Sequence, residues 1–221
     1  MSFTNEKSYE KILNSILRLW DRQEDFNFYI ALMSRQFAFE FNHSRRVAYY
    51  AVMLGDYVGC NSRDVAKIGA VALLHDIGKM NVPSTILYKQ GIYNQAERAT
   101  VERHSVYGSQ MLLCSKQLSE LALPVLSHHE RWDGTGYPEQ LRGQEIPLAA
   151  RITHIAEAFD VMTTIQNYQS LKSPEEALDE LKRFAGSQFD RTLVNAFINL
   201  ESSFLESGSL PVYHTATGSF R

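Results

Sequence analysis

Ala70-Val-Ala-Leu-Leu-His-Asp-Ile-Gly-Lys79 joins an apolar run to two side chains that can ligate a metal. The run has the composition of a buried helix, and Gly78 ends it. A neutral imidazole beside a carboxylate suits a divalent transition metal. A hydrogen bond between a buried His75 and Asp76 would account for the pair without any metal. The meaning of this stretch therefore depends on what the rest of the chain supplies.

The composition and charge of the 221-residue chain narrow its class. Apolar residues make up 44%, enough for a sizeable core. The formal net charge of −3 disfavours binding to polymeric nucleic acid, which requires a basic surface. No apolar run approaches the roughly 20 residues of a membrane helix, and the N-terminus does not resemble a signal peptide. The two cysteines, Cys60 and Cys114, are consistent with a reducing compartment and not with a disulfide framework. Together these features predict a cytoplasmic protein that does not enter a membrane.

Helical periodicity runs through most of the chain, and no stretch shows convincing strand alternation. Asn94 and Glu97 form a variant of the capping box and begin one helix, in whose middle His104 lies. Pro124 fits the first turn of a short helix that carries the pair His128-His129. The other helices are expected at residues 8–35, 36–58, 63–77, 149–165, 174–185 and 190–204. The sequence therefore predicts an all-α fold with six or more helices around one core.

Histidines and carboxylates recur where these helices face inward or end beside a turn. They are His43, His75, Asp76, His104, His128, His129 and Glu157. Each one alone is better explained by packing in the core. Together they form a histidine-rich set with a carboxylate that can bridge, which is the kind of set that holds two divalent metals. Ligands made only of oxygen would instead favour magnesium, and cysteines would favour structural zinc.

The same residues, in this order, resemble the HD phosphohydrolase superfamily. Within it, His128-His-Glu-Arg-Trp-Asp-Gly-Thr-Gly-Tyr-Pro138 is similar to the signature of the HD-GYP subfamily. Further motifs that fit this subfamily are His75-Asp-Ile-Gly-Lys79, Gly143-Gln-Glu-Ile-Pro147, Ala150-Arg-Ile152 and Gly186-Ser-Gln-Phe-Asp190. The resemblance covers about residues 36–200 and implies an HD-domain helical bundle with extra N-terminal and C-terminal helices.

The resemblance implies a metal-dependent phosphodiesterase that hydrolyses a cyclic dinucleotide, cyclic di-GMP above all, to a linear dinucleotide or to mononucleotides. Its two divalent metals would be iron or manganese in preference to zinc, nickel or cobalt. The implied metal ligands are His43, His75, Asp76, His104, His128, His129 and Glu157. Asp76 would bridge the metals, and Lys79 would neutralise the phosphate under attack. The residues expected to contact substrate are Lys79, Gly136, Tyr137 and Asp160.

Three departures from the family pattern bear on activity. Glu157 stands where the family usually has aspartate, and its extra methylene can change the metal spacing. Phe39 stands where some members have a glutamate for a third metal, and Glu40 is one residue out of phase, so we expect two metals. Gln166 and Gln169 stand where arginines commonly contact phosphate. Two alternatives therefore stay open: a catalytically weak module that binds a cyclic dinucleotide or a partner, and a hydrolase of another phosphorylated nucleotide.

The resemblance also divides the chain. We expect an N-terminal helical extension at residues 1–35, an HD-GYP catalytic domain at 36–205 and a loose tail at 206–221. The apolar stripe of the N-terminal helices is suited to a homodimer contact. The loop that contains Gly136, Tyr137 and Pro138 is the surface through which a diguanylate cyclase domain is expected to bind.

Overall fold

The computed structural model describes residues 18, 20, 23–164 and 171–206 of the chain, and these confirm the all-α prediction. Apart from one isolated β-bridge between Ala185 and Phe189, the described residues form helices, turns and loops. The elements are α2 (Glu24–Gln36), α3 (Ala38–Tyr57), α4 (Ser62–Leu74), η1 (Ile77–Asn81), α5 (Ser84–Leu87), α6 (Gln95–Glu102), α7 (His104–Leu113), α8 (Ser119–Leu126), η2 (Gly143–Glu145), α9 (Leu148–Thr163), α10 (Pro174–Arg183) and α11 (Arg191–Glu206).

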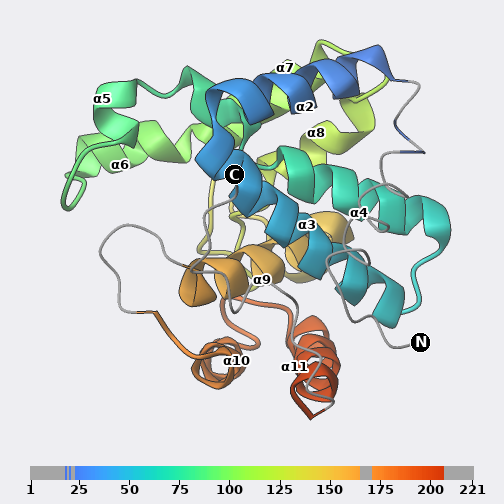
Figure 1. Cartoon of the computed structure of the whole chain (residues 1–221). Helices are drawn as coiled ribbons and strands as arrows, with labels where there is room; N and C mark the ends of the chain where they lie inside the picture. Colours follow the sequence, from blue (N-terminus) through green and yellow to red (C-terminus); the bar gives the residue numbers. More distant parts are fainter. Residues whose placement is uncertain (1–17, 19, 21–22, 165–170, 207–221) are drawn as a thin grey trace.

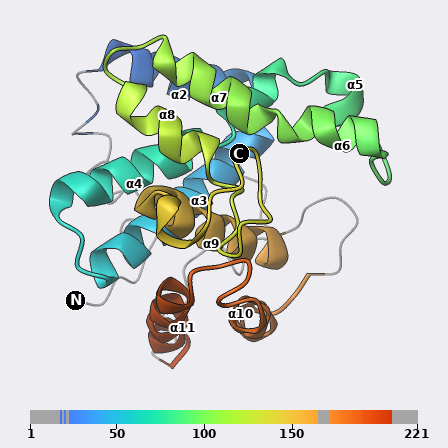
Figure 2. The same ribbon diagram turned by 180° about the vertical axis from the view of Figure 1, so that it is seen from behind.

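Helices α3, α4 and α9 pack against one another in the middle of the molecule (Figure 1). Both views place α10 and α11 beyond α9 at one end, and α2, α7 and α8 at the opposite end (Figure 2). Tyr50 of α3, Phe159 of α9 and Phe197 of α11 are fully buried where these helices meet. The ring of Phe159 lies 5.2 Å from that of Tyr50 and 5.1 Å from that of Phe197, in edge-to-face contact. This aromatic cluster ties the C-terminal helices to the central ones.

The 3-10 helix η1 packs directly on α7 through two glycines. A Cβ atom on Gly78 would overlap the carbonyl oxygen of His104 and the backbone nitrogen of Gly108. Only glycine permits this approach of two backbones. The contact holds the chain that follows Asp76 against the first turn of α7.

The start of α7 corrects one prediction. The capping box of Asn94 and Glu97 is confirmed, but the helix that it begins ends at Glu102. The chain bends at Arg103, and His104 opens α7 instead of lying within a continuous helix. The bend places the His104 carbonyl against Gly78, which continuous helical periodicity does not reveal.

The position of Pro124 corrects a second prediction. It lies inside α8 instead of in the first turn of a helix, because α8 already begins at Ser119. The helix ends at Leu126, so His128 and His129 belong to the turn that follows it. The hydrogen bond that Pro124 cannot donate falls at Glu120, which is exposed and open to water.

Several predicted features lie outside the described residues. They are most of the N-terminal helix before Glu24, the positions Gln166 and Gln169, and the tail from residue 207. The described N-terminal segment ends with α2, and Phe37 separates it from α3. None of the described helices is both long enough and apolar enough to cross a membrane.

The close packing of η1 on α7 gives a stability prediction. Gly78→Ala should lower the free energy of unfolding by about 3 kcal/mol, because the new methyl group meets backbone that cannot rotate away. Gly55→Ala is a matched control, since its methyl group would come closest to the flexible end of Ile68, at 2.9 Å, and would meet no backbone atom of another segment within 3.9 Å. Denaturant unfolding with a chelator present measures both. Equal losses in the two variants would show that the Gly78 contact is not as tight as described.

Candidate metal centre

The structure brings all seven predicted metal ligands together from five separate segments. They are His43 of α3, His75 and Asp76 after α4, His104 of α7, His128 and His129 after α8, and Glu157 of α9. Six of them form two groups in which every ligand atom lies within 4.8 Å of the others: His104 with His128 and His129, and His43 with His75 and Glu157. Asp76 lies between the groups.

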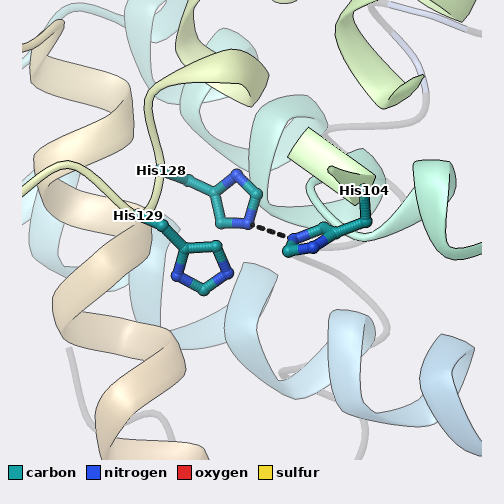
Figure 3. Close-up of side chains that lie close together, drawn as sticks. All are labelled: His104, His128 and His129. Carbon is teal, nitrogen blue, oxygen red and sulfur yellow. Dashed lines mark hydrogen bonds between the residues drawn. The ribbon is translucent and has the colours of Figure 1, made fainter. Parts of the chain in front are cut away.

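The first group shows two imidazoles whose free nitrogens face each other. Nδ1 of His104 lies 2.7 Å from the Val101 carbonyl, and Nδ1 of His128 lies 2.6 Å from the Val125 carbonyl. A carbonyl only accepts, so both Nδ1 atoms carry hydrogen and both Nε2 atoms present lone pairs. Those Nε2 atoms are 3.2 Å apart and are joined by the dashed line in Figure 3.

Two lone pairs at this separation need a cation between them. Burial lowers the pKa of His104 to about 4 and lowers that of His128 well below its usual value, so a shared extra proton is disfavoured. Two nitrogens bound to one ion at about 2.1 Å are roughly 3.0–3.4 Å apart in octahedral or tetrahedral geometry. The ring of His129 lies 5.0 Å from that of His104 and supplies the third nitrogen (Figure 3). Burial also lowers its pKa. This group therefore fits a divalent metal.

The second group contains buried ligand atoms that have no hydrogen-bond partner. The Nδ1 atom of His75 donates to the Ala72 carbonyl at 2.8 Å, which turns Nε2 toward the site. Among the described residues, neither Nε2 of His75 nor Oε2 of Glu157 has a hydrogen-bond partner, although both atoms are buried. Buried polar atoms without partners are costly, so a site that collects them indicates a missing ligand. A cation is the ligand that a nitrogen lone pair and a carboxylate oxygen share.

Asp76 reaches both groups with its two carboxylate oxygens. Oδ1 lies 3.5 Å from Nε2 of His104, and Oδ2 lies 3.3 Å from Nε2 of His75. Oδ1 is buried and has no hydrogen-bond partner among the described residues. Burial raises the pKa of Asp76, but interactions led by the positive charge of Lys79 outweigh it and hold the pKa well below its usual value. An ionised carboxylate between two ligand groups is suited to bridge two metals.

Lys79 is bound to this carboxylate. Its Nζ atom lies 2.6 Å from Oδ2 of Asp76, and about a quarter of its side chain is exposed. Burial lowers the pKa of Lys79, but the charge of Asp76 outweighs it and leaves the pKa above its usual value. Lys79 therefore brings a positive charge to the edge of the site.

Asp160 does not have the place that was expected for it. It is fully buried, and its Oδ2 atom lies 2.7 Å from Nδ1 of His43. Arg46 donates to both of its oxygens, at 2.6 and 2.9 Å. Burial alone would raise the pKa of Asp160, but the hydrogen bonds from His43 and Arg46 keep it below its usual value. A carboxylate engaged in this way orients His43 and is not available to a substrate.

Arg46 is the residue of this arrangement that the sequence did not single out. It follows His43 by three positions in α3, as Asp160 follows Glu157 in α9. Residues three apart lie on one face of a helix, so the two helices present matching pairs to each other. The spacing is a signal, but it has meaning only once α3 and α9 are known to pack together.

The Gly-Tyr-Pro loop lies beside the first ligand group. The ring of Tyr137 stacks on that of His129 at 4.9 Å. Gly136 is buried, and a Cβ atom there would overlap the backbone of Glu130 and Arg131. Close packing within the loop therefore explains why this position requires glycine. Substrate contact by Gly136 and Tyr137 stays a prediction.

A cleft of about 650 Å³ opens at the second ligand group. His43, Glu157 and Lys79 lie on its wall, and aromatic side chains from α3 and from the segment after η1 extend the wall outward. A second cavity of about 330 Å³ shares Glu157 and Val161 with the first and reaches His129. The ligand groups thus lie between two openings of the size used for small molecules.

Comparison with known families shows the family to which the chain belongs. The family model described as HD domain matches residues 28–193. The chain therefore belongs to the HD-domain family, and its motifs place it in the HD-GYP subfamily, as the sequence predicted.

The relatives with established names are longer proteins. A cyclic di-GMP phosphodiesterase of Thermotoga maritima is 34% identical over 166 residues, which are 74% of this chain and 45% of the relative. The 3'3'-cGAMP-specific phosphodiesterase 2 of Vibrio cholerae is 35% identical over 172 residues, 76% of this chain and 33% of the relative. The chain thus spans less than half the length of either.

Solved structures confirm the fold. Bd1817, an HDG"Y"P protein from Bdellovibrio bacteriovorus, superposes with a TM-score of 0.62 over 90% of this chain and 65% of its own. The two sequences are 18% identical, so this similarity concerns the architecture alone.

The buried hydrogen bond behind His43 gives a prediction for metal affinity. Asp160→Asn should weaken metal binding about tenfold to hundredfold, because His43 loses the carboxylate that orients its ring. Competition titration against a chromophoric chelator measures the affinity, and thermal melting checks the fold.

Asp190→Asn is the matched control for this experiment. Asp190 is also buried and pairs with an arginine, Arg151, at 2.7 Å, but it touches none of the predicted ligands. Its loss should leave metal affinity unchanged. Equal metal affinity in the Asp160 variant and the wild-type protein would contradict the orienting role of Asp160.

Proposed function

We propose that this chain is a metal-dependent phosphodiesterase that hydrolyses a cyclic dinucleotide, with cyclic di-GMP as the favoured substrate. The observation that carries the proposal is Asp76, a buried carboxylate between two groups of candidate ligands, of which the second borders a cleft. The relatives named as cyclic di-GMP and 3'3'-cGAMP phosphodiesterases support the substrate class.

The predicted ligands would hold two divalent metals, and mixed imidazole and carboxylate ligands favour iron or manganese. Such a pair supplies a nucleophile at neutral pH and electrostatic stabilisation for in-line displacement at phosphorus. The chain's own residues prepare the site for it. Backbone carbonyls fix the tautomers of His75, His104 and His128, and Asp160 fixes His43.

Lys79 is the group that we assign to the substrate phosphate. It lies on the wall of the cleft, and its ammonium group is held by Asp76 at the boundary between ligands and open space. A fixed positive charge there stabilises the charge that develops on a phosphate during attack. Its hydrogen bond to Asp76 orients the ammonium group before substrate arrives.

Further parts of the proposal come from the sequence and from the family resemblance. We assign the catalytic domain to residues 36–205 and the reaction to the cytoplasm. We also propose that the Gly136-Tyr137-Pro138 loop contacts a diguanylate cyclase domain and that the N-terminal helices support a homodimer. Thr135, which directly precedes this loop, is exposed and gives such a partner access to it.

The role of Lys79 can be tested with metal-loaded protein. Lys79→Ala should lower the rate of cyclic di-GMP hydrolysis about hundredfold, because the phosphate loses a charge-assisted contact in the transition state. Metal content should stay close to that of the wild-type protein. Product chromatography measures the rate, and it also identifies a linear dinucleotide or mononucleotide product.

Lys89→Ala is the control for charge alone. Lys89 is exposed and pairs with Glu97, away from the ligand groups, so its removal should leave the rate unchanged. Wild-type turnover in the Lys79 variant would remove Lys79 from the mechanism. Binding of cyclic di-GMP without any turnover by the metal-loaded wild-type protein would instead support the regulatory module.

A further inference from the structure

The outer wall of the larger cleft contains a carboxylate and two aromatic side chains that the proposed chemistry leaves unused. Phe39 and Glu40 come from the first turn of α3, and Tyr88 follows α5. The two aromatic residues are more than half exposed, at 56% for Phe39 and 53% for Tyr88. Large aromatic surfaces at the wall of a cleft are suited to stack on a flat ligand.

Glu40 lines the same cleft as these two rings and as His43 of the candidate metal centre. It precedes His43 by three residues in α3, so the two side chains lie on one face of the helix. It interacts electrostatically with Lys79 on the same wall, and, after burial, its charge contributes to raising the pKa of Tyr88. Glu40 belongs to neither ligand group. A carboxylate has about four acceptor sites and can therefore accept hydrogen bonds from a ligand.

We propose that this wall is a base-binding subsite selective for guanine, in which Glu40 accepts hydrogen bonds from the guanine edge while Phe39 and Tyr88 stack on the ring. The inference rests on the proposed function, because it assumes that a cyclic dinucleotide enters this cleft. Guanine presents N1–H and the N2 amino group side by side, two donors that match the two oxygens of a carboxylate. Adenine presents the N1 lone pair at that edge, which a carboxylate repels.

The second cavity does not offer a matching carboxylate. Glu180 lies on its wall, but Lys172 approaches the carboxylate at 3.1 Å and Arg183 at 2.6 Å. Each oxygen of Glu180 is therefore paired with a cation, which makes this carboxylate a weaker acceptor for a base. The two cavities therefore differ, and only the base in the larger cleft is selected. Cyclic di-GMP and 3'3'-cGAMP can each place a guanine in the larger cleft, whereas cyclic di-AMP has no guanine to place there.

The test compares affinities in the metal-loaded protein by calorimetry, with non-hydrolysable phosphorothioate analogues of cyclic di-GMP and cyclic di-AMP. These two ligands carry the same charge, so the ratio of their affinities cancels any general effect of removing a negative charge. The wild-type protein should bind the guanine analogue at least about tenfold more tightly. Glu40→Gln should bring the ratio close to one or reverse it, because an amide can pair with adenine.

Two further variants separate stacking from selection. Phe39→Ala should weaken both analogues about tenfold and keep their ratio, since stacking does not distinguish the bases. Glu180→Gln, a carboxylate of the second cavity, should leave the ratio unchanged. An unchanged ratio in Glu40→Gln, or equal affinities in the wild-type protein, would overturn the inference.

The outcomes also distinguish this inference from the proposed function. If both analogues bind with the expected ratio but unmodified cyclic di-GMP is not hydrolysed, the guanine subsite stands and the proposed activity fails. If cyclic di-GMP is hydrolysed and Glu40→Gln keeps the wild-type ratio, the activity stands and the subsite fails. If neither analogue binds, the guanine subsite is overturned.

Discussion

The buried carboxylate of Asp76 is the constraint on which the rest of the structure depends. A charged group without a compensating partner in a protein interior is strongly unfavourable. Here one oxygen points to His75 and Lys79, and the other has no hydrogen-bond partner among the described residues. The surrounding imidazoles present lone pairs instead of protons. Cations shared with these imidazoles satisfy the carboxylate and the nitrogens at the same time.

The helical framework is arranged to keep those imidazoles in one orientation. His75, His104 and His128 each donate Nδ1–H to a carbonyl three residues earlier in their own segment, so local backbone sets the tautomer. His43 lies within a helix whose carbonyls are already engaged, and it depends on Asp160 of α9 instead. Packing of α3 against α9 therefore contributes directly to the site, and the contact of Gly78 with α7 brings His104 to Asp76.

Sequence reasoning reached the fold class and the residues of the site because both have local signals. Periodicity predicted the helices, the capping box marked the start of α6, and the ordered histidines predicted a ligand set whose members the structure brings together. What it missed depends on contacts between distant segments. The bend at Arg103, the role of Asp160 and the presence of Arg46 become visible only once α3, α7 and α9 are packed. Glu40 has no role until Tyr88 and the cleft are in place.

The most direct test of this account is anomalous scattering from crystals of the metal-loaded protein, recorded at the absorption edge of the bound metal. The account predicts two peaks with Asp76 between them. One should be bound by His104, His128 and His129, and the other by His43, His75 and Glu157. A single peak bound by only one of these groups, or two peaks that Asp76 does not contact, would contradict the bridging role of Asp76.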